Sequence, residues 1–331
     1  QIGNSVLPVS LGETGKGIIM REDFTYPSSD GKNMIHGIRW TPEDEPIAVL
    51  QIVHGMVEFI ARYEEFAEYL TRQGFAVVGE DHLGHGESAM SEEDLGYFGK
   101  GGNGFLMEDI HHLRKMTTEQ WPDIPYFMLG HSMGSFLLRQ YLVEGEKAPY
   151  AEGLSGAVVM GTGWQPGIAL KLGTTLSGFA EMFRGDRHRS RLIEKMALGS
   201  NNRKIKNPRT KDDWLSKDTE VVDAYEENPL CQFHFTVNAY YNMFKGIRKC
   251  QDRQLMKRLP EKFPMLFISG AEDPVGNYGD GVRKAYMVYL ENSAADVHIK
   301  LYEEDRHEIL NETNREDVYS YLLTWLKNRM L

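Results

Sequence analysis

An apolar run, a serine between two glycines and a second apolar run follow one another at residues 126–138, which read YFMLGHSMGSFLL. The central residues Gly130-His131-Ser132-Met133-Gly134 match the pattern G-x-S-x-G. The first apolar run predicts a buried strand, and residues 133–143 predict a helix. A serine at such a strand–turn–helix junction is typical of an exposed nucleophile, because the glycines leave room for a sharp bend. An ordinary glycine-rich turn is the alternative interpretation.

Strand and helix patterns alternate on both sides of this stretch. Further buried strands are predicted at 47–53, 75–79, 154–160, 265–269 and 297–302, and further helices at 62–73, 105–121, 282–290 and 316–327. Residues 18–26 and 32–40 flank the sequence Ser-Ser-Asp-Gly and predict an antiparallel hairpin ahead of these units. The alternation predicts an α/β protein with a mostly parallel sheet and helices on both faces.

The alternation stops for about a hundred residues after the fourth predicted parallel strand. The intervening segment contains apolar, basic, charged and aromatic pieces with helical spacing. Because a structureless loop of this length is rare inside a compact domain, we expect a folded helical insertion, or cap. The chain is therefore divided into an N-terminal core part (1–162), a helical cap (163–260) and a C-terminal core part (261–331).

A serine becomes a strong nucleophile only when a base takes its proton and a carboxylate orients that base. Asp273 follows the predicted strand 265–269, and His307 follows the strand 297–302. The carboxyl ends of parallel strands gather at one edge of a sheet, so both residues are candidates for the partners of Ser132. The rival acids are Glu272, Asp305 and Glu308. A helix-capping role for Asp273 and a solvated His307 are the alternatives.

Acyl transfer also needs backbone N–H groups that bind the oxyanion of the transition state. One candidate is Met133, the residue after the serine, and the other is Met56, in the loop that follows the strand 47–53. His54, at the end of that strand, is interpreted as a brace for the loop and not as a base.

Five motifs together resemble the monoacylglycerol lipase/lysophospholipase branch of the α/β-hydrolase superfamily. They are His54-Gly55-Met56, residues 81–88 (DHLGHGES), residues 130–134, residues 272–276 (EDPVG) and Arg306-His307-Glu308. The resemblance covers about residues 17–161 and 263–326, and in the cap only patches such as residues 228–231. It implies an α/β-hydrolase fold, the triad Ser132, Asp273 and His307, and oxyanion donors at Met56 and Met133. Residues 57–60 (VEFI) depart from the family, which often has a histidine after the glutamate.

The cap carries the candidates for substrate binding. Its apolar side chains with helical spacing are Leu170, Leu172, Leu176, Phe179, Met182 and Phe183. They predict an acyl channel, a surface that transiently contacts membranes, or simple packing of cap on core. We assign Leu176, Phe179 and also Trp164, at the sheet edge, to substrate binding. The arginines between 184 and 191 are interpreted as a solvated face, with contact to anionic membranes as the alternative.

Composition limits the remaining possibilities. The 331 residues carry 37 basic and 48 acidic side chains, a net charge of −11, which argues against nucleic acid as a partner. Two cysteines cannot form a disulfide framework, so a reducing, cytoplasmic location is expected. No apolar run is long enough to cross a membrane, and residues 1–5 show no signal-peptide pattern.

The sequence therefore predicts a serine hydrolase of carboxylic esters that acts through an acyl-enzyme on a small ester or lipid, with monoacylglycerols or lysophospholipids implied by the resemblance. No metal or other cofactor is implied: the histidines of residues 81–85 suit a buttressed turn, and Asn311 breaks the zinc pattern that starts at His307. The alternatives are a short-chain or feruloyl-type esterase, a thioesterase, an aminopeptidase, or a non-catalytic ligand-binding homologue. Epoxide and haloalkane hydrolysis would need a carboxylate in place of Ser132.

Overall fold

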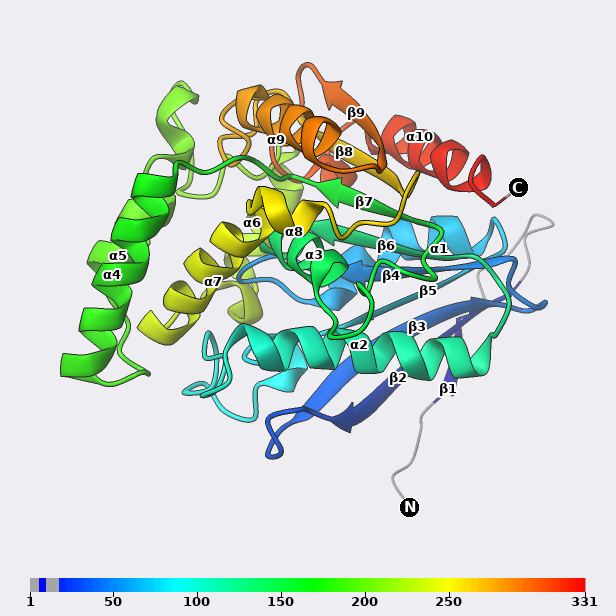
Figure 1. Ribbon diagram of the computed structural model, residues 1–331, viewed down its shortest axis with the longest axis horizontal. Helices are drawn as coiled ribbons and strands as arrows, with labels where there is room; N and C mark the ends of the chain where they lie inside the picture. Colours follow the sequence, from blue (N-terminus) through cyan, green and yellow to red (C-terminus); the bar gives the residue numbers. More distant parts are fainter. Residues whose placement is uncertain (1–5, 10–17, 331) are drawn as a thin grey trace.

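Nine strands form one sheet in the part of the chain that the computed structural model describes, residues 6–9 and 18–330 (Figure 1). They are β1 (Val6–Val9), β2 (Ile19–Pro27), β3 (Met34–Pro42), β4 (Ala48–Val53), β5 (Phe75–Glu80), β6 (Tyr126–His131), β7 (Gly156–Met160), β8 (Pro264–Gly270) and β9 (Asp296–Tyr302). Their order is β1-β2-β3-β5-β4-β6-β7-β8-β9, antiparallel up to β5 and parallel beyond it. The predicted hairpin is confirmed as β2 and β3.

Helices cover both faces of the sheet, which explains why its central strands are apolar without alternation. In β4, all six residues are buried: Leu50 and Ile52 face one hydrophobic cluster, and Val49 and Val53 face the other. Two helices complete the first cluster, α1 (Glu64–Thr71) and α10 (Arg315–Lys327). The second includes side chains of α2 (Asn103–Gln120), α3 (Met133–Val143) and α9 (Asp280–Asn292), and others from the segment between β7 and β8. This arrangement confirms the predicted α/β-hydrolase fold.

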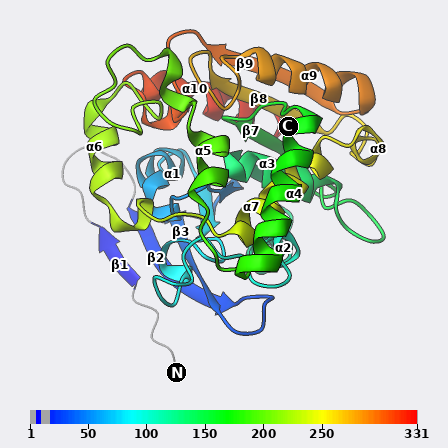
Figure 2. The ribbon, with the colours of Figure 1, turned by 90° about the vertical axis from the view of Figure 1, so that its left-hand side faces the viewer.

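The segment between β7 and β8 is helical, as expected of the insertion. It contains α4 (Gly167–Arg184), α5 (Arg191–Leu198), α6 (Thr219–Glu227), α7 (Val237–Cys250) and the short α8 (Arg253–Met256). In Figure 1, α4 and α5 lie at the far left, beyond the end of the sheet, and Figure 2 shows them in front of it. The division into three parts at residues 162 and 260 stays a prediction.

Short 3-10 turns connect several of these elements: Ile60–Tyr63, Gly86–Ser88, Asn201–Lys204, Pro229–Cys231 and Ile309–Asn311. The first of them replaces the opening turn of the helix predicted at 62–73. Within residues 6–9 and 18–330, no helix is both long enough and apolar enough to cross a bilayer.

Candidate active site

Ser132 lies at the sharp turn between β6 and α3, as the sequence pattern predicts. Its backbone has φ of 53° and ψ of −121°, a conformation that non-glycine residues rarely adopt. The two glycines of the pattern make this turn possible. A Cβ atom on Gly130 would lie 2.3 Å from the carbonyl oxygen of Gly134, and one on Gly134 would lie 2.0 Å from that of Val53. The turn therefore packs directly against the end of β4.

His307 and Asp273 meet at the carboxyl ends of β9 and β8. Both side chains are almost completely buried, and Nδ1 of His307 lies 2.9 Å from Oδ1 of Asp273. The N–H of His307 does not point squarely at this oxygen, a misalignment common in catalytic pairs before substrate binds. The Asp273 carboxylate also accepts hydrogen bonds from the Ser269 hydroxyl (3.1 Å) and the Val275 N–H (2.8 Å). These two donors fix the carboxylate beside the imidazole.

The rival acids lie elsewhere. Glu272 is exposed, and the carboxylate of Glu308 is paired with Arg62. Asp305 is buried, which raises the pKa of its carboxyl group. Of the acids considered from the sequence, Asp273 is the one within hydrogen-bonding distance of the His307 imidazole.

His307 also packs against the turn that carries Ser132. The rings of His131 and His307 are 4.7 Å apart, and Nε2 of His131 lies 3.3 Å from the carbonyl oxygen of His307. Since His131 precedes Ser132 in the chain, this contact joins the loop that contains His307 (the histidine loop) to the sharp turn at Ser132 (the elbow).

The loop after β4 lies against the elbow. A Cβ atom on Gly55 would lie 3.0 Å from Cβ of Ser132, so the loop backbone touches the serine. Met56 is the next residue of this loop and is partly buried. Met133 opens α3, where the first N–H groups of a helix have no partner within the helix. Met133 therefore follows Ser132 in the chain, and Met56 follows Gly55, which contacts Ser132; the role of both as oxyanion donors stays a prediction.

His54 braces this loop. Its Nδ1 lies 2.8 Å from the carbonyl oxygen of Gly55, and its Nε2 accepts a hydrogen bond from the His82 N–H (2.9 Å). An imidazole that donates at one nitrogen and accepts at the other is neutral. Burial and the neighbouring imidazoles of His82 and His85 lower the pKa of His54 well below its usual value, in agreement with this assignment.

A buried network of charged side chains joins the loop after β4 to the histidine loop. Arg62 contacts Glu58 (2.9 Å) and forms a bidentate pair with Glu308 (2.8 and 2.7 Å). Glu58 also accepts hydrogen bonds from Tyr63 (2.9 Å), from the N–H of Gly55, and from Nδ1 of His131 (3.2 Å). One carboxylate therefore holds both the loop after β4 and His131, the residue before Ser132.

The pKa values in this network follow from its charges. Burial alone would raise the pKa of Glu58, but His131 and Arg62 outweigh burial and lower it. Burial likewise opposes the effect of Arg62 on Glu308, whose pKa is also lowered. Burial would lower the pKa of His131, but its contact with Glu58 raises it. Both nitrogens of His131 face acceptors, as an imidazolium requires.

The cap contributes contacts that the sequence analysis missed. The ring of Trp214 lies 4.8 Å from the His307 ring, and the carbonyl oxygens of Trp214 and Leu215 accept the N–H groups of His307 (3.4 Å) and Glu308 (2.7 Å). An isolated tryptophan in a charged segment was the available signal. The hydroxyl of Tyr225 donates to the carbonyl oxygen of Val57 (3.0 Å), so the cap also touches the loop after β4.

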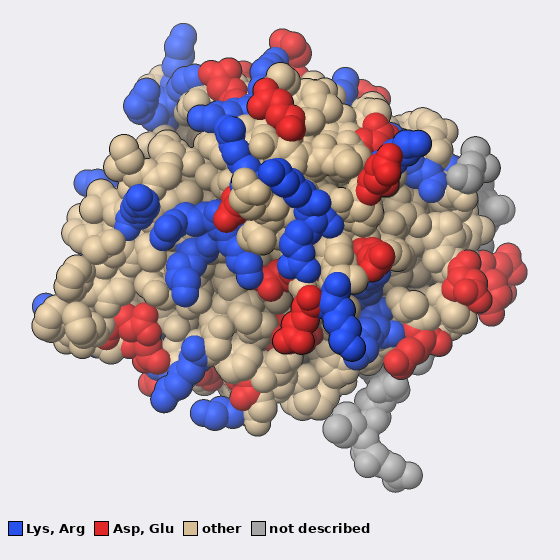
Figure 3. Space-filling view, in the orientation of Figure 1, with Lys and Arg blue, Asp and Glu red and all other residues tan. Residues whose placement is uncertain are grey.

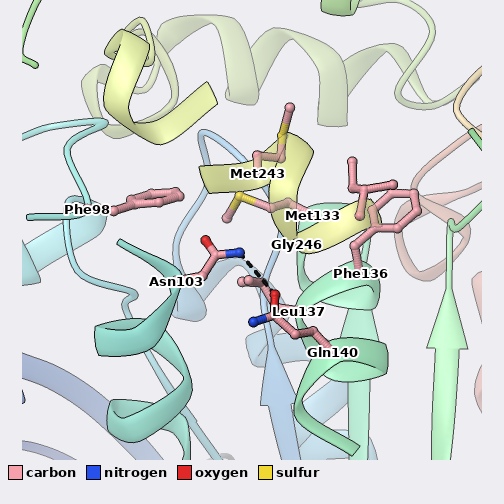
Figure 4. Close-up of a pocket in the computed structure, with 9 residues that line it drawn as sticks. Phe98, Asn103, Met133, Phe136, Leu137, Gln140, Met243 and Gly246 are labelled. Carbon is pink, nitrogen blue, oxygen red and sulfur yellow. Dashed lines mark hydrogen bonds between the residues drawn. The ribbon is translucent and has the colours of Figure 1, made fainter. Parts of the chain in front are cut away.

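The residues assigned to substrate binding lie in different surroundings. Trp164 is partly buried and packs against the core, and Leu176 is also partly buried. Phe179 is 53% exposed and stacks on Phe183, with ring centroids 6.4 Å apart. None of the three lines the cavity that reaches Met133 (Figure 4). Their assignment to substrate binding stays a prediction.

Comparisons with known proteins identify the family of the chain. A family model described as "Serine aminopeptidase, S33" (Hydrolase_4) matches residues 44–314. The monoacylglycerol lipase of Mycolicibacterium smegmatis is 24% identical over 313 residues, 94% of this chain and 98% of that protein. An abhydrolase domain-containing protein of Dictyostelium discoideum is 24% identical over 88% of this chain, which spans only 27% of that longer protein.

A solved structure shows the same architecture. The carboxyl esterase of Bacillus coagulans, determined in complex with glycerol, superposes with a TM-score of 0.87 at 29% identity, over 94% of this chain and 99% of that one. With the match to the family model over most of its length, the chain belongs to the Hydrolase_4 (serine aminopeptidase, S33) family of α/β-hydrolases.

Proposed function

We propose that this protein is a serine hydrolase that cleaves carboxylic esters through an acyl-enzyme. The observation that carries the proposal is the strained turn that presents Ser132, with the His307–Asp273 contact of 2.9 Å at the same edge of the sheet. A backbone strain of this kind is maintained where the surrounding structure requires it, and such positions cluster at active sites.

Each residue has a step in the proposed reaction. The Ser132 hydroxyl attacks the ester carbonyl carbon while His307 takes its proton, and the N–H groups of Met56 and Met133 bind the resulting oxyanion. Asp273 stabilises the imidazolium that forms. The C–O bond to the alcohol then breaks, and His307 returns the proton to the leaving alcohol. Water repeats the sequence on the acyl-serine and releases the acid.

Monoacylglycerols or lysophospholipids are the proposed substrates. Support comes from the name of the M. smegmatis relative, a monoacylglycerol lipase, and from the apolar character of α4 in the cap. If the cap walls an acyl channel, each buried methylene adds about 0.8 kcal/mol, or about fourfold in binding. We therefore expect kcat/KM to rise with acyl length over several carbons and glycerol monoesters to be preferred to triacylglycerols.

Contact between the cap and a lipid surface is part of this proposal. Along α4, the side chains of Ile168 and Phe183 are 85% and 75% exposed, and the cap end of the face shown in Figure 3 is largely uncharged. Exposed apolar patches of this kind mark interaction surfaces. Binding to phospholipid vesicles, lost in an Ile168→Ser/Phe183→Ser variant that keeps its activity on dissolved esters, would support this contact.

Peptide-bond hydrolysis is the second candidate, because the family description names an aminopeptidase. An aminopeptidase must bind the free ammonium group of its substrate, usually with a carboxylate. Two buried carboxylates of the loops around Ser132, Glu58 and Glu308, are both already paired with Arg62, and a third, Asp273, faces His307. This pairing favours esters.

A fluorophosphonate probe tests serine catalysis directly, since a working triad reacts with it and a non-catalytic homologue does not. Labelling of wild type and its loss in Ser132→Ala, with an unchanged unfolding midpoint, is the expected result. Assays with p-nitrophenyl esters of graded chain length and with aminoacyl p-nitroanilides then distinguish ester hydrolysis from aminopeptidase activity. An unchanged esterase rate in folded Ser132→Ala would refute the proposal.

A further inference from the structure

A cavity beside Met133 is apolar except for two amide side chains. It lies between α2, α3 and α7, has a volume of about 10 Å³, and is lined mainly by side chains such as Phe98, Met133 and Met243. The two amides are Asn103, at the start of α2, and Gln140, on α3 (Figure 4). The cavity therefore begins at the residue next to the proposed nucleophile.

The carbonyl oxygen of Asn103 faces this cavity without a partner. Asn103 is more than nine-tenths buried, and within the described part of the chain its Oδ1 has no hydrogen bond. In Figure 4, this oxygen points toward the space between Phe98 and Met133. Its amide nitrogen is fully occupied, since Nδ2 donates to Oε1 of Gln140 and to the carbonyl oxygen of Asn242, both at 3.0 Å. A buried acceptor of this kind needs a donor, which a water molecule or a ligand hydroxyl can supply.

The direction of the Asn103 amide is fixed by a chain of hydrogen bonds that starts at the surface. Lys249 forms an ion pair with Glu144 at the surface. The Glu144 carboxylate can only accept hydrogen bonds, so the group of Gln140 that faces it at 2.8 Å is the Nε2 donor. Oε1 of Gln140 must then face Asn103 and accept its Nδ2. Exchanging the nitrogen and oxygen of Asn103 would place two acceptors against each other at Gln140 and again at Asn242. The group that faces the cavity is therefore an acceptor by chemical necessity.

We propose that this cavity is a subsite for a hydroxyl group of the substrate, which donates to Oδ1 of Asn103. No charged side chain lines the cavity, so a neutral donor fits it better than an ammonium group. Its volume suits one water-sized group. The thioether side chains of Met133 and Met243 adapt readily to a chain that leads to that group. The proposal deepens the proposed function, on which its catalytic assay rests.

The position along α3 indicates how far the hydroxyl stands from the ester. Met133 and Gln140 are seven residues apart on one face of the helix, about 10 Å along its axis. Asn103 donates to Gln140, the far member of this pair, so we expect a hydroxyl that reaches Asn103 to stand several carbons from the bond that is broken. An ω-hydroxyacyl chain of medium length is the expected source, and a hydroxyl of the alcohol part is the other source of the same chemistry.

The test compares matched esters with and without the hydroxyl. One series pairs p-nitrophenyl ω-hydroxyalkanoates of four to twelve carbons with the corresponding p-nitrophenyl alkanoates, and a second pairs 1-hexanoylglycerol with propyl hexanoate. For each pair, we divide kcat/KM of the ester with the hydroxyl by kcat/KM of the ester without it. In Asn103→Leu, we expect this ratio to fall by about fivefold or more in one of the two series. The series that responds shows whether the hydroxyl belongs to the acyl chain or to the alcohol. Met243→Leu is the matched control, because it lines the cavity without changing its polar group, and should leave the ratio unchanged.

Two further measurements keep the result decisive. Gly246→Ala places a Cβ atom 2.3 Å from Nδ2 of Asn103 and 2.7 Å from Oε1 of Gln140, so it should disturb the same pair and reproduce the effect if Asn103→Leu does not fold. Calorimetric binding of ω-hydroxyalkanoate and alkanoate anions needs no catalysis. One outcome separates the two proposals: wild type binds the hydroxy acid more tightly, the variants lose this preference, and no ester is hydrolysed. That outcome would refute the proposed function and support the subsite. Unchanged ratios and unchanged binding preferences in both variants would show that the cavity holds water only and overturn the subsite.

Discussion

Replacing Arg62 with methionine should destabilise the protein strongly and in a pH-dependent way. The guanidinium is nearly buried and neutralises two carboxylates, Glu58 and Glu308, whose side chains are at most 5% exposed. Two opposite charges about 4 Å apart attract by about 4 kcal/mol at an effective dielectric constant of ~20. Desolvation of the charges offsets much of this attraction, and removal of one partner of a buried pair costs about 3–5 kcal/mol. We expect a loss within that range at pH 7.

The sign of the pH dependence follows from the pKa directions. In wild type, the pKa values of Glu58 and Glu308 are lowered, so their contribution to stability is complete above about pH 4.3 and is lost as the pH falls further. Without Arg62, burial of the unpaired Glu308 carboxylate raises its pKa, so the variant regains stability as this group takes up a proton. The difference between the two proteins should therefore shrink from pH 7 toward pH 4.

Urea unfolding, followed by the fluorescence of the five tryptophans, gives the free energy of unfolding at both pH values. Arg72→Met is the matched control, because Arg72 pairs with Glu68 four residues away, as Arg62 does with Glu58, but at the surface. We expect that control to cost about 0–1 kcal/mol. A loss in Arg62→Met no larger than in the control, or a difference that does not narrow in acid, would refute the reasoning.

Three further predictions concern single side chains. Asp273→Asn should lower kcat on p-nitrophenyl butyrate at least ~10²-fold with unchanged stability, whereas Asp305→Asn should change it less than about threefold; the reverse order would identify the wrong acid. Gly134→Ala should destabilise the protein by about 1–3 kcal/mol or more in urea unfolding, because its Cβ would press on two carbonyl oxygens at the end of β4; a neutral result would show that the elbow relaxes. Burial raises the pKa of Cys231 to about 12, and Cys250 is equally buried, so neither should react with Ellman's reagent at pH 8 until urea is added; rapid reaction of the native protein would contradict the packing of the cap.

The sequence predicted best the features that depend on residues close together in the chain. The strand, turn and helix around Ser132 lie within 18 residues, and the spacing of apolar side chains marks each element there. Asp273 and His307 could be predicted because the carboxyl ends of parallel strands meet at one edge of the sheet. Residues that follow different strands in the sequence are therefore close in space. Their contact of 2.9 Å follows that rule.

Long-range contacts between irregular segments carried no such pattern. Arg62 and Glu308 are 246 residues apart, and neither the 3-10 turn of the first nor the loop of the second has a periodicity that points to the other. The tilted contact between the rings of Trp214 and His307 depends on the path of the cap. Along α4, the helical spacing was clear, but only the structure shows that Leu170 is buried and Phe179 exposed.

The insertion point of the cap has an evolutionary consequence. β7 and β8 are adjacent parallel strands, with Ala157 opposite Met265, so the chain leaves the sheet and returns beside the strand it left. Ladder hydrogen bonds between these strands do not depend on the length or sequence of what joins them. A lineage can therefore lengthen, shorten or exchange this crossover while the strands that precede Ser132, Asp273 and His307 stay in register. The sheet can therefore stay unchanged while this crossover varies, but the contacts of Trp214 with His307 and of Tyr225 with Val57 would have to be rebuilt in each new cap.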